Sequence, residues 1–130
     1  MQILIIGLSG SGKTSLAKEL SARLNAMHLN ADVVRAEAND WDFSAVGRLR
    51  QAQRMAEKSN ALGAVVIDMI APLKLHRLII KADKVIWMNT KQESKYKDTD
   101  SLFEPPSNAD IVITDFEYDV ADIIAKLGIV

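Results

Sequence analysis

Three glycines, a lysine and a threonine near the start of the chain carry the strongest chemical signal in the sequence. The stretch GLSGSGKT (7–14) satisfies the pattern G-x-x-x-x-G-K-[ST] and stands between an apolar run and a segment of helical period. Gly7, Gly10 and Gly12 allow the backbone to bend tightly, so that successive N–H groups point at phosphate oxygens. A helix that begins near Lys13 adds the positive end of its dipole. The sequence therefore predicts a loop that holds a nucleoside triphosphate.

Side chains that would act on the triphosphate lie in this loop and at the end of a later apolar run. Lys13 would reach the β- and γ-phosphates, and the Thr14 hydroxyl would bind Mg²⁺. Asp68 ends the run 64–67, where we expect it to hold metal-bound water or to orient the acceptor hydroxyl. An aspartate that only caps the following turn is the alternative. We therefore expect ATP and Mg²⁺ as cofactors, with Lys13 and Asp68 as catalytic residues and Thr14 and Asp68 as metal ligands. The nucleotide-binding residues would be the whole loop: Gly7, Leu8, Ser9, Gly10, Ser11, Gly12, Lys13 and Thr14.

Short apolar runs alternate with segments of helical period along the chain. The expected strands are 2–6, 31–36 (ADVVRA), 64–70, 84–89 and 110–114. The expected helices follow the phosphate loop, run from about 45 to 62 behind Ser44 as N-cap, begin at Pro72, and close the chain with Val120, Ile123, Ile124 and Leu127 on one side. This alternation predicts an α/β fold in three layers, with about five parallel strands and helices on both faces, in one domain over 1–130. The stretch 90–109 is expected to be a long irregular loop with a function.

Two carboxylates come directly after the expected strand 31–36. Parallel sheets gather ligand-binding groups at the carboxyl ends of their strands, so either Glu37 or Asp40 could be the base on the acceptor side. The alternative for each of them is a solvated carboxylate in a loop.

Composition and charge exclude several classes of protein. With 130 residues, of which 48% are hydrophobic and 25% charged, the chain is of ordinary globular type and long enough to bury a core. A formal charge of −1 gives no overall attraction to nucleic acid or to a membrane, so any site for a polyanion must be local. The absence of cysteine excludes disulfides, thiolate zinc sites and cysteine nucleophiles. No apolar run approaches the roughly 18 residues that span a bilayer, and we expect a cytoplasmic protein without a membrane partner.

Four segments resemble adenylylsulfate kinases, and they do so in that family's order. GLSGSGKT is similar to the family's phosphate loop. DFSAVGRLRQAQRM (42–55) is similar to F-S-x-x-x-R-x-x-N-x-x-R, with Gln51 in place of asparagine and matches at Phe43, Ser44, Arg48 and Arg54. IAPLKLHR (70–77) is similar to I-S-P-x-x-x-x-R, and DSLFEPP (100–106) resembles D-S-x-Y-E-x-P. The resemblance covers most of the chain and implies the P-loop kinase fold.

The resemblance also implies an acceptor site. In that family the matched phenylalanine stacks on the adenine of the acceptor, and the matched arginines hold its phosphate and sulfate groups. Phe43, Arg48 and Arg54 would therefore bind the acceptor, with Glu37 or Asp40 close by. The chemistry agrees, since aromatic faces take bases and guanidinium groups take phosphate. The alternatives are a core phenylalanine at a helix start and two arginines on a solvated helix face.

Two of the family's motifs are missing. RAEAND (35–40) stands where D-G-D-N is expected after the second strand. The basic lid R-D-x-K-x-L-Y is absent as well, since IWMNT (86–90) is followed by the short polar stretch KQESKYKDTD (91–100). A kinase without a closing lid has a more open cleft. An open cleft suits an acceptor hydroxyl that is carried by a polymer.

Three functions remain open at this point. The matched motifs favour a kinase that makes phosphoadenylyl sulfate from adenylyl sulfate. The missing D-G-D-N and lid favour a kinase for 5-hydroxymethyluracil within DNA, and in size and plan the chain resembles, more loosely, compact phage kinases of that kind. The third function is a nucleotide-binding regulator without transfer activity, although the acceptor-side phenylalanine and arginines argue against it.

Basic residues are available for a DNA acceptor. They recur on about one face of the helix expected at 45–62 and in the loop that follows 86–90: Arg48, Arg50, Arg54 and Lys58, then Lys91, Lys95 and Lys97. Both sets would also serve as ordinary solubilising charge. We expect an ATP-dependent kinase with an alcohol group on a nucleotide-type acceptor, and we favour modified DNA slightly over adenylyl sulfate.

Overall fold

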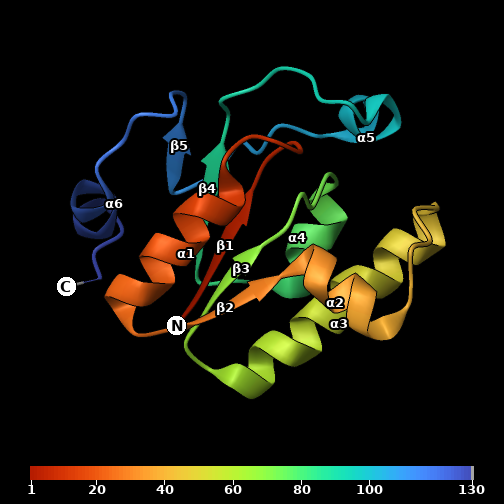
Figure 1. Cartoon of the computed structure of the whole chain (residues 1–130), viewed down its shortest axis with the longest axis horizontal. Helices are drawn as coiled ribbons and strands as arrows, with labels where there is room; N and C mark the ends of the chain where they lie inside the picture. Colours follow the sequence, from red (N-terminus) through yellow and green to blue (C-terminus); the bar gives the residue numbers. More distant parts are fainter. Residues whose placement is uncertain (130) are drawn as a thin grey trace.

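The chain forms five parallel strands between two layers of helices (Figure 1), and a computed structural model describes residues 1–129 of it. The strands lie in the spatial order β2-β3-β1-β4-β5 and are β1 (Gln2–Ile6), β2 (Met27–Asn30), β3 (Val65–Asp68), β4 (Lys84–Met88) and β5 (Ile111–Ile113). The helices are α1 (Lys13–Leu24), α2 (Ala31–Ala38), α3 (Ala45–Leu62), α4 (Lys74–Ile80), α5 (Lys97–Leu102) and α6 (Val120–Lys126). The predicted three-layer fold class is confirmed.

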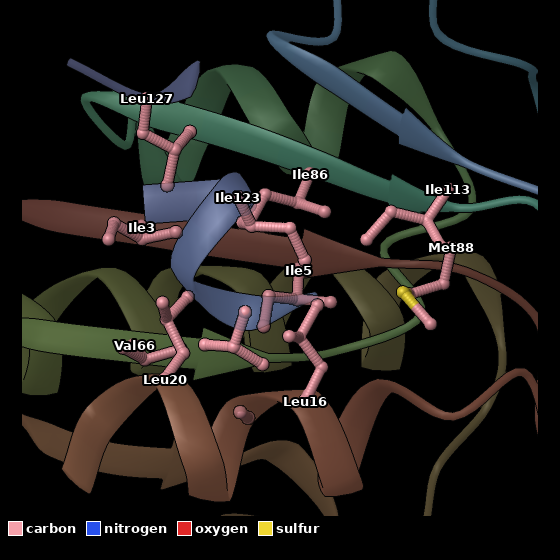
Figure 2. Packing of buried hydrophobic residues seen from close by; sticks show 12 residues of the cluster. Ile3, Ile5, Leu16, Leu20, Val66, Ile86, Met88, Ile113, Ile123 and Leu127 are labelled. Carbon is pink, nitrogen blue, oxygen red and sulfur yellow. The ribbon is translucent and has the colours of Figure 1, made fainter. Parts of the chain in front are cut away.

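The central strand β1 is apolar along its length because helices cover both of its faces. Ile3 and Ile5 point to one face, where they pack with Leu16 and Leu20 of α1 and with Ile123 of α6 (Figure 2). The neighbouring strands β3 and β4 close both edges of β1. A strand that is buried on both faces does not alternate between apolar and polar residues, which is why its sequence is one continuous apolar run.

The opposite face of the sheet packs against α2, α3 and α4. Leu4 and Ile6 of β1 lie in a second cluster with Val34 of α2, Met55 of α3 and Ile80 of α4. In Figure 1 these three helices lie on one side of the sheet, while α1 and α6 lie on the other. The sheet is therefore the middle layer, and each layer of helices has its own hydrophobic core.

The parallel register brings the carboxyl ends of three strands together. Ile5 of β1 pairs with Asp68 of β3, and Asp68 pairs with Asn30 of β2. The chain leaves β1 at Gly7, where a Cβ would lie 2.7 Å from the carbonyl oxygen of Met88, so only glycine allows this close approach. The phosphate loop thus starts at the edge of the sheet where these strand ends meet.

The second strand lies earlier in the chain than expected. The prediction of a strand at 31–36 is wrong, because these residues belong to α2 and the strand is β2. Asn30 starts the helix, since its Oδ1 accepts a hydrogen bond from Val33 N at 3.0 Å. Asn39 ends the helix in the left-handed region, with φ +49°.

An edge strand such as β2 gives little signal in the sequence. Its first residue, Met27, is 56% exposed, and none of its four residues is fully buried. Neither an apolar run nor a clean alternation can arise under these conditions. As a consequence, Glu37 lies in the last turn of a helix and Asp40 just beyond it, so neither residue follows a strand as expected.

The other helices lie close to their predicted places. The helix expected at 45–62 is α3, and its predicted N-cap is confirmed, because the Ser44 hydroxyl accepts a hydrogen bond from Gly47 N at 3.2 Å. The helix expected from Pro72 begins at Lys74. Within residues 1–129 no helix combines the length and the apolar character needed to cross a membrane.

The stretch 90–109 contains the helix α5, so the expectation of a wholly irregular loop is wrong. Asp100 of α5 accepts hydrogen bonds from the backbone N and from Oγ of Ser94, both at 2.6 Å. The sequence of this helix, KDTDSL, has no apolar period, so periodicity could not reveal it. Polar contacts of this kind hold the segment in place.

Two neighbouring valines test the corrected assignment of α2. Val34 is fully buried, whereas Val33 is 57% exposed. Val34→Ala should lower the free energy of unfolding by about 2 kcal/mol, because it removes buried methyl groups and leaves a cavity. Val33→Ala should raise it by about 0.5 kcal/mol, since alanine is the better helix former, whereas in a strand the same change would lower it. Urea unfolding measures both values, and a loss of stability in Val33→Ala would contradict the helix.

Candidate active site

The phosphate loop connects β1 to α1, as its sequence context requires. α1 begins at Lys13, directly after Gly12, whose φ of +97° lies in the left-handed region. Lys13 is 9% exposed, and its Nζ donates a hydrogen bond to the carbonyl oxygen of Leu8 at 3.0 Å. Burial lowers the pKa of Lys13, and the charges of Asp68 and Asp32 oppose that shift. The ammonium group therefore sits against the backbone of its own loop.

A carboxylate from β3 lies beside the start of α1. Oδ2 of Asp68 accepts hydrogen bonds from Thr14 Oγ1 at 2.7 Å and from Asn30 Nδ2 at 2.8 Å, and His28 Nε2 lies 3.3 Å from it. Asp68 is 2% exposed, so these partners offset the cost of burying its charge. Within residues 1–129 no backbone N–H of the following turn donates to Asp68, which removes the alternative of a turn cap.

Thr14 and Asp68 fit the requirements of Mg²⁺. They present a hydroxyl oxygen and a carboxylate oxygen 2.7 Å apart. This metal prefers oxygen ligands, and it typically takes one or two protein groups and completes its shell with water and substrate phosphates. The two side chains stand next to the loop on which a triphosphate would lie, so the residues present suit a metal that is shared with the nucleotide.

A cavity of about 860 Å³ joins the phosphate loop to the predicted acceptor side. Its wall includes Lys13, Thr14 and Asp68 on the nucleotide side. Phe43 and Arg48, which the resemblance implies as acceptor-binding residues, line the same cavity. Its volume is in the range of small-molecule sites. A triphosphate on the loop and an acceptor beside Phe43 would therefore share one space.

Phe43 lies at the surface of this cavity with two guanidinium groups beside its ring. It is 51% exposed, which excludes the alternative of a core phenylalanine. The guanidinium carbon of Arg35 lies 4.4 Å from the ring centroid, and that of Arg48 lies 5.5 Å from it. Arg48 is 9% exposed, so it is not part of a solvated helix face, and it donates to the carbonyl oxygen of Phe43 at 2.8 Å. An aromatic face framed by two positive charges suits a base that carries phosphate.

The residues Arg54, Glu37 and Asp40 do not line the cavity. Asp40 is held by two arginines, because Arg50 Nε and Arg54 Nη2 lie 2.7 Å and 2.9 Å from its Oδ2. Their hydrogen bonds hold the pKa of Asp40 well below its usual range. Glu37 is exposed in the last turn of α2. The positions of these three residues therefore give no support to the acceptor role expected for them.

Two residues of α2 that the sequence left without a role line the cavity, namely Asp32 and Arg35. Because β2 ends at Asn30, the segment that begins at the end of the second strand is NADV (30–33) and not RAEAND. Asp32 stands at the third position of D-G-D-N when that pattern is aligned to NADV, whereas the other three positions differ. The sequence did not indicate this position because the second strand was predicted at 31–36. The pairing of β2 with β3 shows where the strand lies.

The segments 70–77 and 100–106, which both resemble adenylylsulfate kinases, are in contact with each other. Arg77 Nη2 donates a hydrogen bond to the carbonyl oxygen of Glu104 at 2.6 Å. The same guanidinium group lies 5.1 Å from the ring centroid of Phe103. None of these three residues lines the cavity, whereas the turn just before α4 does. The contacts therefore shape a wall of the cavity without touching its contents.

Comparisons with known proteins agree with this geometry. The profile of a protein family described as "AAA domain" matches residues 3–120. Two structures of the APS kinase CysC from Mycobacterium tuberculosis, a point mutant and a complex with AMPPNP and APS, have TM-scores of 0.79 and 0.76 and sequence identities of 24% and 20%. Each alignment covers 98% of this chain and 96% of the other. A gluconokinase from Sinorhizobium meliloti has a TM-score of 0.69 at 14% identity, over 97% of this chain and 88% of its own. No curated protein sequence matches the chain.

The structural matches share the fold of this chain. Together with the family profile they confirm the resemblance to adenylylsulfate kinases, which are the APS kinases of these structures. At such low identities the likeness shows the fold alone. The looser resemblance to phage DNA kinases stays a prediction.

The arginine pair around Asp40 is expected to stabilise the fold above acidic pH. The folded protein holds the pKa of Asp40 below the value of an unfolded chain, about 3.9. Its contribution is therefore present above that value and is lost as the pH falls through the folded pKa. Asp40→Asn should lower the Tm at neutral pH, with a gap to the wild type that narrows below about pH 4. Asp122→Asn is the control, since its ion pair with Lys126 is exposed and contributes little. Equal Tm values at neutral pH would contradict the stabilising role.

Proposed function

The chain belongs to the family described as AAA domain, and on that premise we propose that it is an ATP-dependent kinase. It would transfer the γ-phosphate of ATP to a hydroxyl group on a nucleotide-type acceptor, with residues 1–130 as one kinase domain. One observation carries the proposal: the phosphate-loop lysine, the Thr14–Asp68 pair and the Phe43–Arg48 pair line the same cavity. Phosphoryl transfer depends on holding donor and acceptor in line, and a shared cavity allows this.

The residues on the nucleotide side would bind and orient the triphosphate. The N–H groups of the phosphate loop and the start of α1 would face phosphate oxygens of a bound triphosphate. Lys13 would exchange its present hydrogen bond with the carbonyl oxygen of Leu8 for a phosphate oxygen. Thr14 and Asp68 would hold Mg²⁺, which supplies positive charge to the transferring group when it is bound. Together these groups would stabilise the negative charge that develops during transfer.

Asp32 is the carboxylate that we propose for the acceptor hydroxyl. It lines the cavity, and its charge acts on Lys13. Within residues 1–129 it forms no ion pair, whereas Oδ2 of Asp68 is already held by three partners. A carboxylate placed in this way can orient the hydroxyl and take its proton. Asp32 thus replaces Glu37 and Asp40 as the expected base.

Residues in the cavity wall favour a nucleic-acid acceptor. Trp41 and Tyr96 line the cavity and are 51% and 50% exposed, and an exposed aromatic ring is a stacking surface for a base. Lys95 lies in the same wall and would neutralise a phosphate. Lys91 does not line the cavity, although its Nζ lies next to Gly10 of the phosphate loop. We therefore propose 5-hydroxymethyluracil within DNA as the first candidate acceptor.

Adenylyl sulfate is the second candidate. The similarity to APS kinase structures favours it, and so does Asp32 at the third position of D-G-D-N. The polar stretch 91–100, however, lacks the R-D-x-K-x-L-Y lid of that family. An enclosed small acceptor needs such a lid more than an acceptor that is carried by a polymer.

Lys13 is expected to be essential for transfer. Lys13→Ala should lower kcat about a hundredfold or more, because this lysine neutralises charge on the transferring phosphoryl group. Lys18→Ala, on the exposed side of the same helix, is the matched control and should leave kcat unchanged. Transfer of radiolabelled phosphate from ATP measures both variants. Full turnover in Lys13→Ala would refute the assignment.

The acceptor is identified by offering adenylyl sulfate and 5-hydroxymethyluracil DNA side by side with radiolabelled ATP. We expect label on the DNA, at a rate that falls steeply with salt because phosphate contacts release counterions. Phe43→Ala should lower kcat/KM for the DNA about tenfold through lost stacking, with ATP binding unchanged. Label on phosphoadenylyl sulfate alone would return the assignment to the second candidate. ATP binding without label on either acceptor would favour a nucleotide-binding regulator.

A further inference from the structure

His76 lies in the wall of the cavity, and it has no part in the transfer proposed above. It belongs to α4 and to the segment 70–77, whose resemblance to the family leaves this position unspecified. Its side chain is 1% exposed. A ring so deeply buried needs a partner for each of its two nitrogens.

The backbone fixes which ring nitrogen carries the proton. Leu73 N donates a hydrogen bond to Nδ1 of His76, with 3.3 Å between the two nitrogens. Nδ1 is therefore an acceptor, and the proton of the neutral ring is on Nε2. Burial lowers the pKa of His76, and the charges of Arg48 and Arg77 lower it further against the opposing charge of Glu104, so the ring is neutral at physiological pH.

Nε2 of His76 is a hydrogen-bond donor that no protein group uses. Within residues 1–129 Nε2 makes no hydrogen bond. In the same part of the chain, Ser11 Oγ is the one fully buried side-chain nitrogen or oxygen that lacks a partner, so Nε2 is not fully buried. Nε2 is therefore not sealed in the core but reaches the cavity that His76 lines. Its N–H must be satisfied from the cavity, by water or by an acceptor atom of a bound molecule.

His76 lines the same cavity as Phe43, where a base would stack, and Arg48 lies in the wall with both of them. Arg48 is close enough to His76 to act on its charge, and its guanidinium carbon lies 5.5 Å from the ring centroid of Phe43. Two of the Arg48 donors are already engaged, by the carbonyl oxygen of Phe43 and by Thr99 Oγ1. Nε2–H of His76 is thus a fixed neutral donor that remains for the edge of a base.

We propose that Nε2–H of His76 reads the base of the acceptor and selects a carbonyl oxygen over an amino group. The inference rests on the proposed kinase and names its substrate class, since 5-hydroxymethyluracil has an oxygen at the ring position where 5-hydroxymethylcytosine has an amino group. The oxygen accepts the hydrogen bond. An amino group would place its own N–H against Nε2–H of His76, and both donors would then lack an acceptor. Such a loss discriminates between two bases more strongly than a difference in their shape.

Two DNA oligonucleotides that differ only in 5-hydroxymethyluracil or 5-hydroxymethylcytosine test this inference. The wild type should have a kcat/KM about tenfold or more higher for the uracil oligonucleotide. His76→Phe, which keeps a flat ring without the N–H, should bring the ratio of the two values close to one. His76→Gln, whose amide N–H can replace Nε2–H, should keep part of the ratio. Leu75→Ala, at an exposed neighbour on α4, is the matched control and should keep the wild-type ratio.

The ratio is insensitive to a loss of folded protein, because both oligonucleotides meet the same preparation. Equal rates of the wild type on both oligonucleotides overturn the inference and leave the kinase standing. An unchanged ratio in His76→Phe does the same. Label on adenylyl sulfate alone also overturns the inference, since adenine has no carbonyl group.

Binding separates the two proposals if no acceptor is labelled. The nitrogen-15 NMR resonance of Nε2 in His76 is followed while each oligonucleotide is added. A shift with the uracil oligonucleotide alone would support base selection and refute the transfer activity. The absence of a shift with either oligonucleotide would overturn base selection as well.

Discussion

One carboxylate oxygen, Oδ2 of Asp68, joins the nucleotide side of the cavity to the sheet. The parallel register brings Asp68 level with Ile5 of β1 and Asn30 of β2, so side chains from neighbouring elements reach it. Thr14 approaches from the start of α1 and fixes how the phosphate loop leaves the sheet. Because a buried carboxylate needs several donors, α1, β2 and β3 cannot shift independently without leaving charge unsatisfied. The loop, the candidate metal ligands and the cavity between them all depend on this contact.

Asn30 connects Asp68 to the acceptor side of the cavity. Its Nδ2 donates to Asp68, while its Oδ1 accepts from Val33 N and starts α2. α2 in turn carries Asp32 and Arg35 into the cavity wall. A single amide group therefore links the two halves of the proposed site. The hydrogen bonds of Asn30 therefore fix the position of α2, and with it Asp32 and Arg35, relative to Asp68 at the end of β3.

The parts of the site that lie within one stretch of sequence were predictable, and those that depend on pairing between distant stretches were not. The phosphate loop needs its residues in a fixed order, and Asp68 ends a buried strand whose apolar run is clear. The resemblance to adenylylsulfate kinases implies that Phe43 binds the acceptor. Its ring is exposed and lines the cavity, as that role would require. Asp32 was missed because the edge strand before it has no apolar pattern. Asp40 resembled a free loop carboxylate because its partners, Arg50 and Arg54, approach from α3.

Asn30 is also a position at which this chain differs from the adenylylsulfate kinases that it resembles. With D-G-D-N aligned to NADV (30–33), its first aspartate falls on Asn30, and an aspartate there would still cap α2 through one of its oxygens. It would have no N–H to donate to Asp68, however, and two carboxylates would then face each other beside Thr14. Such a pair requires a shared proton or an additional cation. The asparagine at position 30 is thus tied to the hydrogen bonding of Asp68. An Asn30→Asp change alone would leave the two carboxylates without the proton or cation that they need.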